Sequence, residues 1–130
     1  MRKTAKERLA EREARARSEL LDSLFEGWIG AADKPETLAR LGPVDPRDPK
    51  AVARAVRSDI LPTFADMTLE TQTRIRAAIT VLAGGDREEF RTYWLELRAP
   101  FGDAEADADA IFPVIARLLG VRLPEADSTG

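Results

Sequence analysis

The sequence predicts an all-α fold: a single-domain helical bundle of five or six helices, with a long N-terminal helix and a central antiparallel helical hairpin at about 69–98. Three observations predict it. Apolar residues recur at three- and four-residue spacing in most segments. No segment shows the sustained alternation of β-branched and aromatic residues that is typical of strands. The length of 130 residues, of which 44% are hydrophobic and 33% charged, suits one globular domain.

The first predicted helix spans about 5–31. Thr4 and Glu7 have the spacing of a capping box, which satisfies backbone N–H groups at a helix start. No Gly or Pro follows before Gly27. The apolar face is weak up to Ala16 and strong from Leu20 onward. We therefore expect the second half of the helix to pack on the core and the first half to project from it.

This division gives the chain three parts. Residues 1–17 form a charged helical arm, residues 18–123 form the bundle domain, and residues 124–130 form a tail that frays because it has little to pack. The charge is divided in the same way. The arm holds seven Lys/Arg and three Asp/Glu, a net charge of +4, whereas the remainder holds thirteen and twenty, a net charge of −7.

Two shorter helices follow in the predicted order. Pro35 suits the first turn of a short helix, and Gly42 suits the position just after its end. Asp48 followed by Pro49 is an N-cap and first-position pair, so another helix starts there. We expect this helix to end near Pro62, with a continuing kinked turn as the alternative.

The strongest helical pattern gives the predicted hairpin at 69–98. Thr68 caps the first helix, the Gly84–Gly85 pair ends it, Asp86 starts the second helix, and Ala99–Pro100 ends that one. Because the connection is so short, we expect the two helices to lie antiparallel. Their inner faces consist of Leu69, Ile75, Ala78, Ile79 and Leu82 in the first helix and Phe90, Tyr93, Trp94 and Leu97 in the second.

Four alternating acids, in the segment "FGDAEADADAIFPV" at 101–114, raise the question of a metal site. A calcium loop of the EF-hand kind that began at Asp103 would need glycine at its sixth position and glutamate at its twelfth, where this chain has Ala108 and Val114. The pattern instead favours a helix capped by Asp103. Pro113 then lies inside that helix, and we expect it to kink or break the helix near Asp109 to Phe112.

The composition excludes several kinds of chemistry. The sequence has no cysteine and no histidine, which excludes thiolate nucleophiles, Ser–His and Cys–His catalysis, and His- or Cys-based metal sites. Catalysis by carboxylates, lysine or tyrosine is still chemically possible. We predict no enzymatic activity, no catalytic residue, no cofactor and no bound metal.

The predicted function is a non-catalytic protein–protein interaction module: an adaptor, assembly factor or regulator that self-associates through its long first helix. Its expected partners are a protein of unknown identity and further copies of the chain. No apolar run approaches the roughly 20 residues that cross a bilayer, so we expect a cytoplasmic protein without a membrane partner. The residues predicted to contact a partner or a second copy are Arg8, Arg12, Arg15, Leu21, Phe25 and Trp28.

Two other functions stay open. The first is a helical binding module for a small apolar or anionic ligand, enclosed by aromatic residues such as Trp28 and Trp94, although most such residues are expected in the core. The second is a regulator that binds nucleic acid through the basic arm. Interleaved acids and the lack of an aromatic residue in the arm make the nucleic-acid hypothesis the weaker of the two.

Overall fold

The computed structural model describes residues 4–84, 87–99, 101–102 and 104–122. Over this part of the chain every regular element is a helix and there is no strand, which confirms the all-α prediction. The described residues form seven α-helices rather than the predicted five or six. They are α1 (Ala5–Leu24), α2 (Pro35–Leu41), α3 (Pro49–Asp59), α4 (Leu61–Ala65), α5 (Leu69–Gly84), α6 (Arg87–Leu97) and α7 (Glu105–Leu118), with a short 3-10 turn, η1 (Ala31–Asp33), after α1.

α1 begins where the sequence predicts, because the Glu7 backbone N–H donates to Thr4 Oγ1 over 3.1 Å. It ends at Leu24, however, and not near residue 31. Turns occupy 25–30, and Gly30 closes them with a φ of 63°, which favours glycine. The Gly30 N–H then donates to the carbonyl oxygen of Leu97 over 2.9 Å. The long-helix prediction is therefore wrong in its last two turns or so, because the chain bends back onto the end of α6.

The prolines explain the next three helices. Pro35 is the first residue of α2, and Pro49 is the first residue of α3, where the Asp48 carboxylate accepts the Lys50 N–H over 3.1 Å. α3 ends at Asp59, since Pro62 has no N–H to extend the ladder. The chain restarts at once as α4, a five-residue helix that carries Phe64 into the core. This separate α4 is the helix that raises the total to seven.

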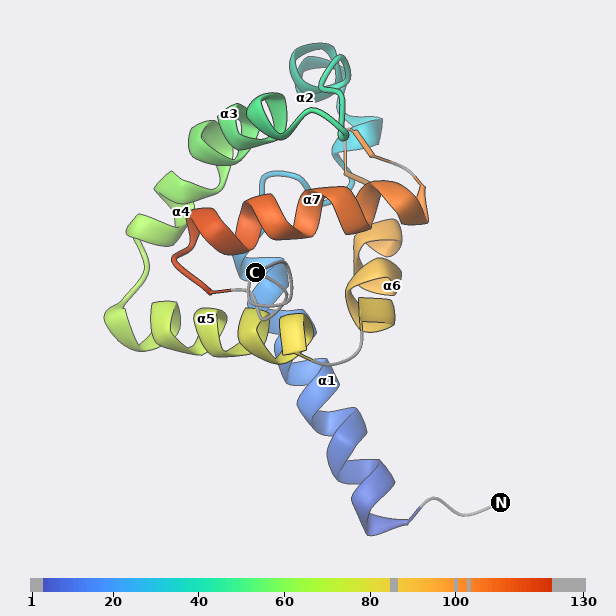
Figure 1. The fold of residues 1–130 in the computed structure, drawn as a ribbon, viewed down its shortest axis with the longest axis vertical. Helices are drawn as coiled ribbons and strands as arrows, with labels where there is room; N and C mark the ends of the chain where they lie inside the picture. The colour runs from blue at the N-terminus through green and yellow to red at the C-terminus, as the bar shows by residue number, and fades with distance from the viewer. Residues whose placement is uncertain (1–3, 85–86, 100, 103, 123–130) are drawn as a thin grey trace, which may run out of the picture.

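α5 begins as predicted, with the Thr71 N–H bonded to Thr68 Oγ1 at 3.1 Å. The proposed stop and start at Gly85 and Asp86 lie outside the described residues. The predicted hairpin is not the centre of the bundle. In Figure 1, α7 crosses the middle of the molecule, and α6 turns upward from α5 rather than running back along it. α7 packs mainly on α3 and α6, whereas α5 packs mainly on α1.

α7 is one continuous helix, although Pro113 lies inside it. The expected break near 109–112 is therefore absent. The predicted cap, Asp103, lies outside the described residues; at the observed N-cap, the Ala104 N–H donates to the Asp107 carboxylate over 3.0 Å. Burial on several sides of the helix offsets the local cost of the proline. The buried residues of α7 are Ala108, Ile111, Phe112, Val114, Ile115 and Ala116.

The outer half of α1 extends beyond the rest of the molecule, at the bottom of Figure 1. Residues 4–13 of this half are all exposed, and contact with the bundle begins near Ala14 and Arg17. Among the described helices, none is both long and apolar enough to cross a bilayer.

Candidate interaction surface

The six residues predicted to contact a partner separate into an exposed set and a buried set. Arg8, Arg12 and Arg15 are exposed on α1. The other three, Leu21, Phe25 and Trp28, are at most 2% exposed. The structure corrects their assignment as exposed contact residues: all three belong to the core of this chain, and only Leu21 also lines one of the surface grooves described below.

Aromatic packing explains why the end of α1 is buried. The ring of Trp28 lies 5.2 Å from that of Phe101 and 6.2 Å from that of Trp94, both edge-on. Such pairs contribute about 0.5–1.5 kcal/mol each beyond the burial of their area. The Trp94 indole N–H donates to the Gly102 carbonyl over 2.6 Å. These residues fill the core, and neither tryptophan lines any of the three surface grooves described below.

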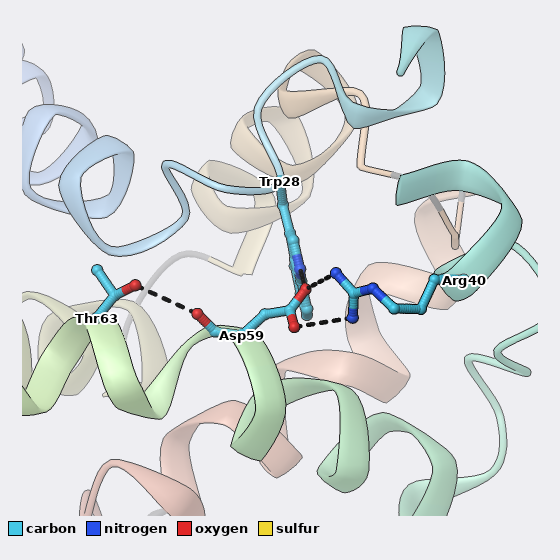
Figure 2. Close-up of polar contacts among 4 residues, drawn as sticks. All are labelled: Trp28, Arg40, Asp59 and Thr63. Atoms are coloured by element: carbon cyan, nitrogen blue, oxygen red, sulfur yellow. Dashed lines mark hydrogen bonds and ion pairs between the residues drawn. The ribbon is translucent and has the colours of Figure 1, made fainter. Parts of the chain in front are cut away.

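A polar cluster fixes the chain just after α1 (Figure 2). Asp59, at the end of α3, accepts the Trp28 indole N–H over 2.8 Å and two N–H groups of Arg40 over 2.9 and 3.0 Å. The Thr63 hydroxyl donates to the backbone carbonyl of Asp59 over 3.3 Å. Burial alone would raise the pKa of Asp59, but hydrogen bonds from Arg40, Trp28 and Ser58 outweigh it and hold that pKa below its usual range. The carboxylate is therefore ionised at neutral pH and holds Arg40 and Trp28 together.

A bidentate ion pair fixes the middle of α1. The Arg17 guanidinium donates to both carboxylate oxygens of Glu89 on α6, over 2.7 and 2.8 Å. The two side chains are only 18% and 29% exposed, so solvent screens this pair less than a surface pair. The hydrogen bonds to Glu89 raise the pKa of Arg17 further. This pair holds the inner half of α1 against α6.

The groove between α1 and α6 is acidic. It has a volume of about 330 Å³ and is lined by Ala14, Ser18, Leu21, Leu82, Glu88, Glu89, Thr92, Tyr93 and Glu96. The Tyr93 hydroxyl donates to Asp22 over 3.0 Å. Burial, and then this hydrogen bond to a carboxylate, raise the pKa of Tyr93 far above its usual range. The phenol stays protonated at neutral pH and is a poor general base.

The groove between α1 and α5 is mainly apolar. It has a volume of about 290 Å³ and is lined by Glu13, Ala16, Arg17, Leu20, Arg74, Ala77, Ala78 and Val81. The α1 residues of this groove continue along one side of the helix to Leu9, because positions 9, 13, 16 and 20 follow four-three-four spacing. Leu9 is 53% exposed and Val81 is 51% exposed. We call this surface the α1–α5 face: Leu9, Glu13, Ala16 and Leu20 of α1 with Ala77 and Val81 of α5.

A third groove lies between α2 and α3, with a volume of about 380 Å³. It contains two guanidinium groups, but that of Arg40 is already bonded to Asp59. Its remaining lining is Leu41, Pro43, Val44, Ala51, Arg54, Ala55 and Ser58. No group of three or more His, Cys, Asp or Glu residues suited to a metal ion occurs within the described residues.

Sequence reasoning missed two features of this surface. The first is the α1–α5 face, whose signal was the spacing of Leu9, Ala16 and Leu20. The second is the pair Arg17–Glu89, for which the sequence gives no local signal because the partners are 72 positions apart. Comparison with protein-family models, with curated proteins and with solved structures finds no match to this chain.

Proposed function

We propose that this chain is a cytoplasmic, non-catalytic protein–protein interaction module, an adaptor, assembly factor or regulator, that self-associates through the α1–α5 face. One observation carries the proposal. A stripe of α1 that runs along its projecting half continues into a mainly apolar groove against α5. Glu13 is the only charged residue of the stripe, and Arg17 and Arg74 are the other charged residues of the groove. A helix of a second copy fits such a face, because it can lie along α1 and contact α5 at the same time.

Burial of Leu9 supplies a driving force. Leu9 is 53% exposed, so its burial contributes about half of the roughly 1.5–3 kcal/mol that complete burial of a fully exposed leucine provides. Two copies bury two such side chains. The charge distribution also supports association between copies, since the arm carries +4 and the remainder −7.

The polar side chains support a non-catalytic role. The sequence supplies no histidine or cysteine as a base or nucleophile. Asp59 is bound by Arg40 and Trp28, and Tyr93 is bound to Asp22 with a raised pKa. Each of these groups has a structural partner in place of a substrate.

Light scattering across a range of protein concentrations tests the proposal. We expect the wild-type chain to approach twice the mass of one chain, and Leu9→Asp to remain at the mass of one. Leu95→Asp is the matched control, because Leu95 is exposed on α6 and does not line the α1–α5 groove. A wild-type chain that stays at one chain mass at every concentration would refute self-association. Equal loss of mass in both variants would place the contact elsewhere.

A further inference from the structure

We infer that two copies pair their α1 helices antiparallel, with Leu9 of each copy in the α1–α5 groove of the other; this inference rests on the proposed self-association. The exposed Leu9 and Leu20, which lines the groove, lie on the same stripe of α1, eleven positions apart. An antiparallel pair that sets Leu9 opposite Leu20 of the second copy brings each leucine to the other copy's groove. Leu9 then meets Ala77 and Val81 as well as Leu20.

This register also suits the middle of the stripe. It sets Glu13 opposite Ala16 of the second copy, so a charged side chain faces a small one that leaves room for water. A parallel pair in register would instead set Glu13 against Glu13, two like charges at the centre of the contact. The antiparallel arrangement avoids that repulsion.

Charges beside the stripe favour the same orientation. Arg12 and Glu19 are both exposed and lie on the same edge of the stripe, seven positions apart. In the antiparallel register Arg12 of each copy lies beside Glu19 of the other, which gives two attractive pairs. In a parallel pair Arg12 would instead lie beside Arg17 of the second copy, whose guanidinium is already bonded to Glu89, so no attractive pair would form there. The antiparallel orientation is thus favoured by two attractive pairs that the parallel orientation lacks.

The three arginines predicted as contact residues then have different positions. Arg12 flanks the contact, whereas Arg8 and Arg15 lie further round the helix and face solvent. Each copy inserts its Leu9 into the groove of the other, so both copies use the same surface. Such a contact has two-fold symmetry and leaves no site for a third copy. The inferred assembly is a dimer and not a filament.

Charge exchange tests this register without changing the apolar contact. We expect Arg12→Glu and Glu19→Arg each to weaken the dimer roughly tenfold, since each places two like-charge pairs across the contact. The double variant R12E/E19R restores the attraction and should return the dissociation constant to within about threefold of wild type. Arg57→Glu, an exposed reversal on α3, should leave it unchanged. Sedimentation velocity measures the constants, and circular dichroism checks that each variant stays helical.

Disulfide cross-linking gives a second measurement. The chain has no cysteine of its own, so only the introduced cysteines can form a disulfide. Chains with Arg12→Cys, mixed with chains with Glu19→Cys, should form a disulfide-linked pair on mild oxidation. Either variant alone should link far less, because the two identical positions lie about 10 Å apart along the helix axes. A dimer in which the double variant is not restored, or in which identical cysteines link best, overturns the register while self-association stands. The absence of any dimer overturns both.

Discussion

The indole N–H of Trp28 donates a 2.8 Å hydrogen bond to the carboxylate of Asp59, across 31 positions of sequence. Trp28 belongs to the turns after α1, and Asp59 is the last residue of α3. The same carboxylate accepts two hydrogen bonds from Arg40. One acidic side chain therefore joins the turns after α1 to α2 and α3.

Replacement of Asp59 should destabilise the fold. In Asp59→Ala the fully buried Trp28 loses the acceptor of its indole N–H, which costs about 1–3 kcal/mol. Loss of the Arg40–Asp59 ion pair adds little to this cost, since the Arg40 side chain is 52% exposed. Urea unfolding followed by tryptophan fluorescence measures the change. Asp66→Ala, an exposed position between α4 and α5, is the control, and equal midpoints for both variants would contradict the anchoring role.

The same residue makes stability depend on pH in a defined direction. Because the folded-state pKa of Asp59 lies below its unfolded value of about 3.9, its ionic contribution is complete above that value and declines as pH falls through the folded-state pKa. We therefore expect the stability difference between wild type and Asp59→Asn to shrink below about pH 4. Unfolding curves at a series of pH values test this. A difference that grows as pH falls would show that the sign is wrong.

The Arg17–Glu89 pair should be worth more than an exposed pair. A double-mutant cycle with alanine at both positions should give a coupling of about 1 kcal/mol, since the pair is bidentate and largely shielded. The Arg98–Asp33 pair has side chains that are 62% and 63% exposed, so the same cycle there should give less than about 0.5 kcal/mol. Thermal or urea unfolding supplies both values. Equal couplings would mean that burial does not strengthen the first pair.

Gly30 should resist substitution because of its backbone conformation. Gly30→Ala forces a side chain into the left-handed region at φ 63°, at a cost of about 1–2 kcal/mol, although the added methyl group would meet no atom within 4 Å. Gly27→Ala is the matched control: it lies in the same series of turns, has equal space and no positive φ, and should change stability by less than about 0.5 kcal/mol. Similar losses for both variants would mean that the positive φ of Gly30 is not the cause of its loss of stability.

Local sequence signals predicted the helix starts well. Thr4, Asp48 and Thr68 all cap helices through their own side chains, as their spacing indicates. The end of α1 was harder to predict, because Gly30 is held by the carbonyl of Leu97, far along the chain. α7 stays helical through Pro113 because its apolar side chains are buried on several sides, which no single stripe reveals.

In the candidate site, too, local features could be predicted from the sequence, whereas contacts between distant segments could not. The charge of the arm and the position of Arg12 could be read from the sequence, whereas the burial of Phe25 and Trp28 depends on aromatic residues of α6. A strong apolar stripe is equally consistent with a core and with an interface until its partners are placed. The weak stripe of Leu9, Ala16 and Leu20 can be identified as part of a surface groove only once α5 is placed beside it.

Hydrogen exchange of the α1 backbone amides, measured at several protein concentrations, tests self-association through the α1–α5 face most directly. Residues 5–13 have no shielding by the bundle, and so short a helical extension opens readily on its own. Protection of these amides should rise with protein concentration, while protection in α3 should stay constant. Protection of residues 5–13 that is the same at every concentration would contradict self-association through this face.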